Sequence, residues 1–140
     1  LIPGSEYQRL SLVTYGTHDH PPLRATWEQL AAEAAQPDGE YAQKEMRRLA
    51  EFANYHAKSL PRELTPELHA AFLESLFRSN SYLAVVMITD LFARTERFNL
   101  PGTAMGANWS QRLHAPVRAL YKEPVLPQLR EILRDSGRVV

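Results

Sequence analysis

A histidine and an aspartate stand directly after a short apolar run near the start of the chain. Residues 12–15 are Leu, Val, Thr and Tyr, and Gly16, Thr17, His18 and Asp19 follow them. In parallel α/β folds, catalytic side chains gather at the carboxyl ends of the strands. A carboxylate placed there can hold sugar hydroxyls or stabilise a cationic transition state, and an imidazole can hydrogen-bond a hydroxyl. The pair therefore indicates a site for carbohydrate chemistry.

Two other interpretations of this pair stay open. Asp19 can simply cap a helix that begins after Pro21, with His18 as an ordinary hydrogen-bonded residue. His18 and His20 can also be viewed as metal ligands, but zinc sites take three or four ligands and the other histidines are scattered along the chain. Glycoside chemistry needs two further carboxylates, a nucleophile and an acid/base. One aspartate is therefore only part of an active site.

A second group of candidate residues lies in a glycine-containing loop later in the chain. Residues 99–103 read Asn-Leu-Pro-Gly-Thr, and Asn108 and Trp109 follow. Asn108 offers amide hydrogen bonds and Trp109 a flat aromatic face, a combination used in sugar sites. A structural turn with Trp109 packed beneath it explains the same residues. Four arginines flank the two loops, but no glycine-rich turn leads from a strand into a helix, so the indication of a phosphate site is weak.

Apolar periodicity predicts the elements that position these loops. We expect strands at about residues 11–15 and 82–89, and the second ends at another polar residue, Asp90. The run 82–89 is continuously apolar and rich in branched side chains, which is typical of a strand covered on both faces. The pattern predicts helices at residues 25–35, 40–58, 65–78, 91–97, 115–121 and 126–135. The expected fold class is α/β, predominantly helical, with about two parallel strands in one segment, residues 1–140.

Length and composition limit the classes of protein. The 140 residues suffice for one domain with a core, but a closed eight-stranded α/β barrel typically takes about 250 residues. Sixteen basic and sixteen acidic residues balance, so neither a nucleic acid nor a membrane is indicated as a partner. The absence of cysteine excludes disulfides and thiolate metal sites. No targeting signal is visible, so we expect a cytoplasmic protein.

Two blocks of the sequence resemble the 4-alpha-glucanotransferases, the family of amylomaltase and disproportionating enzyme. Residues 15–19 (Tyr-Gly-Thr-His-Asp), with Trp27 after them, are similar to the last conserved block of that family. Asp90, residues 99–103 and residues 108–113 resemble the closing block of the family in the same order. One departure is the residue after Asp19, which is a histidine here and often an asparagine in the family. Together the two blocks cover most of the chain.

This resemblance implies a fold, a reaction and a set of site residues. The fold would be an elaborated (β/α)8 barrel of the α-amylase superfamily, with the chain as its C-terminal part. The reaction would be transfer of α-1,4-glucan segments between maltooligosaccharides or glucans by a retaining double displacement, without cofactor or metal. Asp19 would be the catalytic carboxylate that stabilises the transition state. The substrate-binding residues implied are His18, Thr17, Asn108, Trp109 and Asp90.

The resemblance also implies that the chain lacks part of the machinery. The nucleophilic aspartate and the acid/base glutamate of the family lie on earlier strands, and nothing in this chain matches those blocks. We therefore expect a piece of a longer enzyme, inactive alone, that self-associates through the apolar faces of its strands. Its expected partners are the glucan and the rest of the parent enzyme. The alternatives are a non-catalytic glucan-binding or helical interaction module, and a related hydrolase with water as the acceptor.

Overall fold

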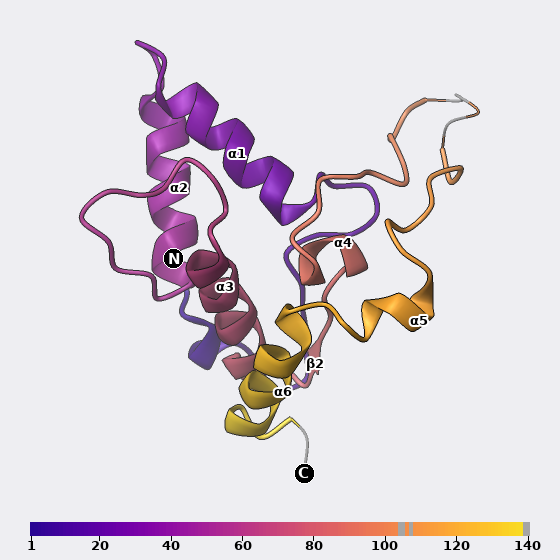
Figure 1. Cartoon of the computed structure of the whole chain (residues 1–140). Coiled ribbons are helices and arrows are strands. Elements are labelled where there is room, and N and C mark those ends of the chain that lie inside the picture. The colour runs from indigo at the N-terminus through magenta and orange to yellow at the C-terminus, as the bar shows by residue number, and fades with distance from the viewer. Residues whose placement is uncertain (104–105, 107, 139–140) are drawn as a thin grey trace.

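The computed structural model describes residues 1–103, 106 and 108–138, and most of its regular structure is helical. The elements, in chain order, are the 3-10 turn η1 (Gly4–Glu6), β1 (Leu12–Val13), α1 (Leu23–Ala34), α2 (Glu40–Phe52), α3 (Pro66–Arg78), β2 (Leu83–Ala84), α4 (Ile88–Leu91), α5 (Val117–Leu120) and α6 (Val125–Asp135). Helices α1, α2 and α3 together form the connection between the two strands (Figure 1). The prediction of a mainly helical chain with two parallel strands is confirmed.

The two strands form a short parallel ladder. Leu12 lies opposite Leu83, and Val13 lies opposite Ala84. Backbone hydrogen bonds of 3.2 Å and 3.0 Å join the strands on either side of these pairs. A parallel pair needs a long crossover connection, and the three helices between the strands provide it. This pairing brings the carboxyl ends of both strands to the same edge.

The strands are shorter and less covered than the sequence predicts. The run 82–89 contributes only Leu83 and Ala84 to the ladder, and helix α4 begins at Ile88. The prediction of cover on both faces is wrong, because Leu83 and Val85 are 52% and 44% exposed. Successive side chains of a strand point to opposite faces, and helices cover one face of this ladder. Ala84 therefore packs against the core while its neighbours face outward.

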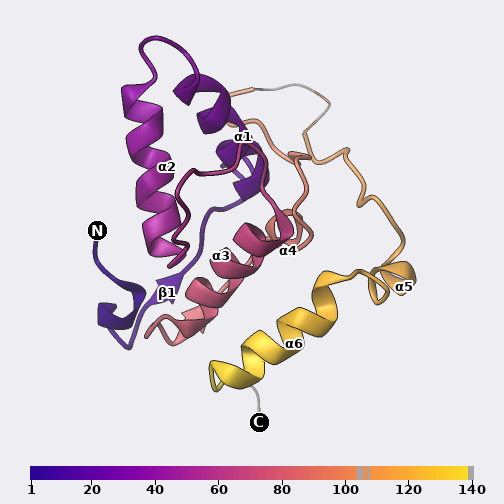
Figure 2. The same cartoon turned by 60° about the vertical axis from the view of Figure 1, so that its left-hand side comes forward.

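Helices α1 and α2 lie side by side as a hairpin (Figures 1 and 2). Gly39 stands in the tight turn between them, where a Cβ atom would clash with the carbonyl oxygen of Glu33. The sequence predicts α2 to residue 58, but it ends at Phe52. Asn54 adopts a positive φ of 53°, and the N–H of Tyr55 donates to the carbonyl of Ala50 at 2.9 Å. This left-handed turn ends the helix six residues before the predicted boundary.

The buried side chains form two clusters on either side of α3. One lies among α1, α2 and α3 and includes Trp27, Leu68 and Phe72, which are fully buried. The other lies beneath the strands, where α3 and α6 run side by side (Figure 2). Tyr15 packs against both clusters, and its hydroxyl donates to the carbonyl of Phe72 at 2.7 Å. Burial raises the pKa of Tyr15 well above its ordinary value, so this hydroxyl stays protonated.

The C-terminal third follows the predicted order with one correction. The helix predicted at residues 91–97 is replaced by α4, which ends at Leu91. Ala93 adopts a positive φ of 49°, and the N–H of Arg94 donates to the carbonyl of Thr89 at 2.7 Å, so the chain turns away from the helix axis. The last two predicted helices are confirmed as α5 and α6. Among the described residues, no helix combines the length and apolar character that crossing a membrane requires.

Candidate functional site

The loop after β1 presents His18 and Asp19 at its tip. The N–H of His20 donates to the carbonyl of Thr17 at 3.0 Å, and Nδ1 of His20 accepts the N–H of Thr17 at 3.2 Å. This reciprocal pair closes a tight turn. The side chains of His18 and Asp19 are each 49% exposed, and Nε2 of His18 lies 3.5 Å from Oδ1 of Asp19. The turn therefore holds both side chains where a ligand in solvent can reach them.

The ring of His20 makes a hydrogen bond within the turn, and this bears on the alternative in which His18 and His20 are metal ligands. Because Nδ1 of His20 accepts a backbone N–H, it is already occupied. In the part of the chain that the structure describes, no three histidine, aspartate or glutamate side chains are grouped to hold a metal ion. The role of His20 here is to close the turn around His18 and Asp19.

Residues that follow the second strand hold Asp19 in place. Nδ2 of Asn99 donates to Oδ1 of Asp19 at 2.7 Å, and a terminal nitrogen of Arg97 donates to the Asp19 carbonyl oxygen at 2.8 Å. Nε of Arg97 is buried and makes no hydrogen bond. Two loops that stand 80 residues apart in sequence therefore meet at one aspartate. These two contacts of Asp19 are not predicted from the sequence, because only the common edge of the two strands indicates that the loops meet.

Trp109 lies beside His18 on the open side of the loop. The centroids of the two rings are 5.1 Å apart, and their planes are tilted by 55°. Trp109 is 60% exposed, so the alternative in which it packs beneath a structural turn is wrong. Its backbone N–H donates to the carbonyl of Phe98 at 2.6 Å, which anchors the end of the loop. The structure thus brings an exposed aromatic face next to the His18–Asp19 pair.

Asn108 closes the loop on which Trp109 stands. Its Oδ1 accepts the N–H of Leu100 at 3.0 Å, and its Nδ2 donates to the carbonyl of Thr103 at 3.0 Å. The amide is therefore engaged with the backbone of its own loop. Residues 104, 105 and 107 of this predicted loop lie outside the described residues. Within the rest of the loop, Asn108 shapes the backbone that presents the indole of Trp109.

Asp90 lies inside the molecule, unlike the other predicted site residues. It is 4% exposed, and its Oδ1 accepts the N–H of Leu23, the first residue of α1, at 2.7 Å. Its carbonyl oxygen accepts a hydrogen bond from Nε2 of His69 at 2.7 Å. Burial raises the pKa of Asp90, and the hydrogen bond from Leu23 opposes that shift. Burial lowers the pKa of His69. Since Asp90 caps α1, the interpretation of Asp19 as that cap is wrong.

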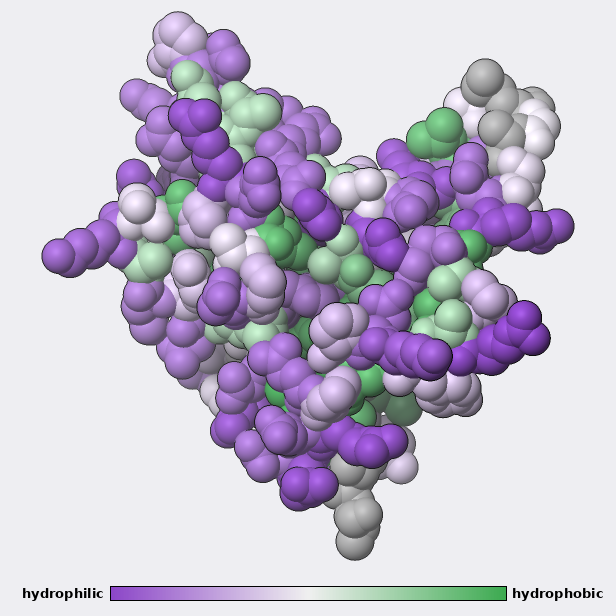
Figure 3. Space-filling model, in the orientation of Figure 1, coloured by the Kyte–Doolittle hydropathy of each residue, from purple (hydrophilic) through white to green (hydrophobic). Residues whose placement is uncertain are grey.

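The His18–Asp19 pair stands on an open surface rather than in a deep cavity. The hollow beside it measures about 10 Å³ and is lined by residues 16–18, 20–22, 87, 89–90 and 96–98, so His18 borders it and Asp19 does not. On the face shown in Figure 3, hydrophilic residues predominate and hydrophobic residues appear mainly in the creases between them. A glucan chain is much larger than this hollow. A complete binding cleft at this site therefore requires walls in addition to the two loops.

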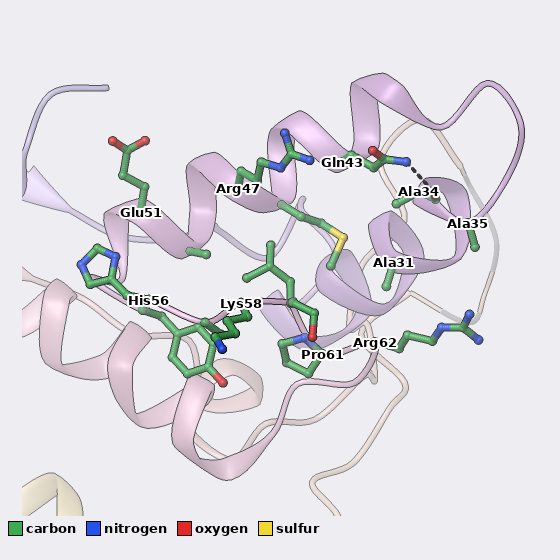
Figure 4. A pocket seen from close by; sticks show the side chains of 16 residues that line it. Ala31, Ala34, Ala35, Gln43, Arg47, Glu51, His56, Lys58, Pro61 and Arg62 are labelled. Atoms are coloured by element: carbon green, nitrogen blue, oxygen red, sulfur yellow. Dashed lines mark hydrogen bonds between the residues drawn. The ribbon is translucent and has the colours of Figure 1, made fainter.

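A far larger hollow, of about 840 Å³, lies away from this pair (Figure 4). It opens between α1, α2 and the segment that follows α2, with Ala31 and Met46 among its apolar lining residues. Arg47 and Arg62 stand on different parts of its rim and do not converge (Figure 4). Among the described residues, Glu51 is the only carboxylate that lines it, whereas glycoside cleavage needs a pair. This hollow therefore lacks the pair of carboxylates that glycoside cleavage needs, as far as its described lining shows.

The comparisons with known proteins agree with this fold. The family model described as 4-alpha-glucanotransferase, glycoside hydrolase family 77, matches residues 2–118. The structure of amylomaltase from Streptococcus agalactiae in complex with acarbose is similar over 94% of this chain, with a TM-score of 0.61 and 19% sequence identity. This chain covers 22% of the length of that amylomaltase chain. No curated protein was found to match the chain significantly.

Proposed function

The chain belongs to the 4-alpha-glucanotransferase family, and from that premise we propose that it forms one wall of an active site that transfers α-1,4-glucan segments between maltooligosaccharides. One observation carries the proposal. Asp19 is held by Asn99 from the second loop, at 2.7 Å, with His18 and the exposed Trp109 beside it. A fixed carboxylate, an imidazole and an aromatic face within one surface are the groups that a sugar ring requires. In this proposal Asp19 is the catalytic carboxylate that stabilises the transition state.

The geometry at Asp19 suits that role. Glycosyl transfer passes through an oxocarbenium-like transition state, and a fixed negative charge stabilises it without reorganisation during the reaction. The amide of Asn99 occupies Oδ1 of Asp19, and Arg97 holds the backbone of the same residue. In this proposal the other carboxylate oxygen accepts hydrogen bonds from sugar hydroxyls. His18 would donate to or accept from a neighbouring hydroxyl, and Trp109 would stack against a sugar face.

The two remaining carboxyl groups of the reaction come, in this proposal, from residues outside this chain. In a retaining transfer a carboxylate attacks the anomeric carbon while a second carboxylic acid protonates the leaving oxygen. The second group then takes the proton of the acceptor hydroxyl as that hydroxyl displaces the nucleophile. This chain covers 22% of the amylomaltase chain, so both carboxyl groups can come from parts of such an enzyme that this chain does not cover. The chain alone is accordingly expected to be inactive, and the reaction needs no metal or cofactor.

The other predicted substrate-binding residues, Thr17, Asn108 and Asp90, differ in how freely their side chains could reach a substrate. The hydroxyl of Thr17 lies 3.1 Å from Nδ1 of His20, so Thr17 supports the turn and borders the site. Asn108 shapes the second loop, and a substrate contact from it would have to share its amide with the backbone. Asp90 is buried, and a direct substrate contact by Asp90 stays a prediction. The cytoplasmic localisation also stays a prediction.

A non-catalytic glucan-binding module is the second candidate. The observation that favours it is the exposed face of Trp109 against His18, because stacking on a sugar needs no acid or nucleophile. The two candidates differ in what Asp19 does. A binding module needs Asp19 only for a hydrogen bond, whereas a transferase needs its charge in the transition state.

The test is a transfer assay on the parent enzyme that contains this chain, with maltotriose as both donor and acceptor. Release of glucose together with longer oligomers indicates transfer, and hydrolysis products alone indicate a hydrolase. We expect Asp19→Ala to lower kcat by about two to three orders of magnitude, with only a small change in the unfolding midpoint because Asp19 and its hydrogen bond to Asn99 are exposed. Asp38→Ala, at an exposed aspartate in the α1–α2 turn, is the matched control. Near-normal turnover of Asp19→Ala would refute the assignment, and wild-type binding without transfer would support the binding module.

A further inference from the structure

Helix α1 begins without a cap of its own. The residue at its N-cap position is Pro22, which has extended backbone angles and no side-chain hydrogen-bonding group. The first N–H groups of a helix lack partners within the helix and need an acceptor from elsewhere. Oδ1 of Asp90 is that acceptor for Leu23, at 2.7 Å and across 67 residues of sequence. The carboxylate of Asp90 in α4 therefore completes the first turn of α1.

Asp90 is itself fixed from a third element. Its carbonyl oxygen accepts the hydrogen bond of His69, a residue of α3 that is 6% exposed. The next residue of α1 makes a second tie, since Arg24 donates to the carbonyl of Ala93, just after the end of α4, at 3.3 Å. Helix α3, the α4 segment and the start of α1 are thus connected through buried or half-buried hydrogen bonds. A carboxylate in this position also interacts favourably with the positive end of the α1 dipole.

These contacts act on the loop that carries His18 and Asp19, because they fix one of its two ends. The loop begins after Tyr15, which is anchored by its hydrogen bond to Phe72 in α3. It ends at Leu23, which is anchored by Asp90. The tight turn between Thr17 and His20 lies between these two anchors. Besides the direct contacts of Asn99 and Arg97 with Asp19, the anchor at Leu23 therefore constrains where the turn lies relative to the second loop.

We propose that Asp90 is a positioning residue, whose buried carboxylate anchors the start of α1 and thereby sets where His18 and Asp19 stand against Asn99 and Trp109. The effect of Asp90 on kcat rests on the proposed function, whereas its effect on the position of the loop rests on the structure alone. It reassigns Asp90 from a substrate ligand to a residue that acts through the loop. Its side chain is buried and accepts a hydrogen bond from the backbone of Leu23, which is the arrangement expected of a residue that positions a functional loop.

Three variants separate positioning from simple stabilisation of a helix. Asp90→Asn keeps an oxygen acceptor for Leu23 and removes the charge. Asp90→Ala removes the acceptor. The double variant Asp90→Ala with Pro22→Asp supplies a cap from within the loop, at a position whose extended backbone suits an N-cap. This double variant restores the cap at the start of α1 without restoring the hydrogen bond between α1 and α4. It also keeps the comparison possible if Asp90→Ala alone does not fold.

The readouts are the unfolding midpoint, the transfer kinetics and the NMR signal of the His18 ring in protein labelled at histidine. The ring of Trp109 shifts the His18 signal because the two rings are 5.1 Å apart. We expect Asp90→Asn to retain the shift and Asp90→Ala to lose at least half of it. For Asp90→Ala we also expect about a tenfold fall in kcat with a smaller change in KM. In the double variant we expect the unfolding midpoint to recover while the shift and kcat stay reduced.

Each outcome decides a separate question. If Asp90→Ala leaves the His18 shift unchanged, or if the double variant recovers shift and kcat along with stability, Asp90 is only a helix cap and the inference is refuted. If Asp90→Asn behaves like Asp90→Ala in the His18 shift, the acceptor geometry is not what positions the loop. Absence of transfer by the wild-type protein would refute the proposed function instead, and the NMR comparison would still decide the role of Asp90.

Discussion

The two tryptophans of this chain lie in opposite surroundings and provide a sharp test of the fold. Trp27 on α1 is fully buried, whereas Trp109 is 60% exposed. The ring of Trp27 meets Phe72 of α3 edge to face at 5.9 Å, and its Nε1–H donates to the carbonyl of Pro61 at 3.1 Å. Trp27 therefore joins α1, α3 and the segment between α2 and α3. We expect Trp27→Ala to destabilise the protein strongly and Trp109→Ala to leave its stability nearly unchanged.

The magnitude follows from the contacts of Trp27. Replacing a buried tryptophan with alanine typically costs about 3–5 kcal/mol in the free energy of unfolding. Of this, the aromatic contact with Phe72 accounts for about 1 kcal/mol and the hydrogen bond to Pro61 for about another 1 kcal/mol. Burial and the cavity left behind account for the rest. We expect a loss of about 4 kcal/mol, a roughly thousand-fold change in the unfolding equilibrium. Trp27→Phe keeps the edge-to-face contact and should lose about 2 kcal/mol.

The assay is urea unfolding followed by far-ultraviolet circular dichroism, which does not depend on tryptophan fluorescence. Trp109→Ala serves as the matched control, with an expected change below about 0.5 kcal/mol. The control should instead weaken binding of a maltooligosaccharide, since its exposed face is the proposed sugar platform. A loss below about 1 kcal/mol for Trp27→Ala, at an unchanged urea dependence, would refute the packing of α1 against α3. Equal losses for both variants would refute the distinction between them.

Three further predictions concern the pH dependence of stability at His69 and at Asp90, and the assembly of the chain. Burial lowers the pKa of His69 from 6.5, so the unfolded chain takes up the proton at a higher pH than the folded chain does. The free energy of unfolding should therefore fall as the pH drops below 6.5. His69→Gln, which keeps a hydrogen-bond donor for the carbonyl of Asp90, should reduce this pH dependence in urea unfolding experiments. Burial raises the pKa of Asp90 from 3.8, so its contribution to stability should fall as the pH rises above 3.8, and Asp90→Asn should abolish that part of the pH dependence. The 140-residue chain alone exposes Leu12, Leu83 and Val85 along its short ladder and should sediment as larger species at micromolar concentration. Leu83→Lys should reduce that association, and a wild-type chain that stays monomeric would contradict the prediction.

The helices were the most predictable part of the fold, because local sequence determines where they start. Thr65-Pro66-Glu67 combines a hydroxyl cap, a first-turn proline and an acid, and the structure begins α3 at Pro66 with Thr65 accepting the N–H of Leu68 at 3.3 Å. The predicted end of α2 and both predicted bounds of the helix at residues 91–97 were wrong. Asn54 and Ala93 adopt left-handed backbone angles there, and an apolar periodic pattern does not reveal which residue will turn. The extent of the second strand was also wrong, because an apolar run does not determine how many of its residues find a partner strand.

The sequence by itself determined the order of the elements, the parallel pair of strands and the placement of His18, Asp19 and Trp109 in loops, because these depend on local patterns and on motifs. The tertiary structure alone decided what holds those residues. Asn99 reaches Asp19 across 80 residues, and Asp90 reaches Leu23 across 67. Hydrogen bonds at such separations depend on how α1, α3 and the two strands pack together. No spacing within either loop specifies them, so the partners of Asp19 and the buried position of Asp90 follow only from the packed chain.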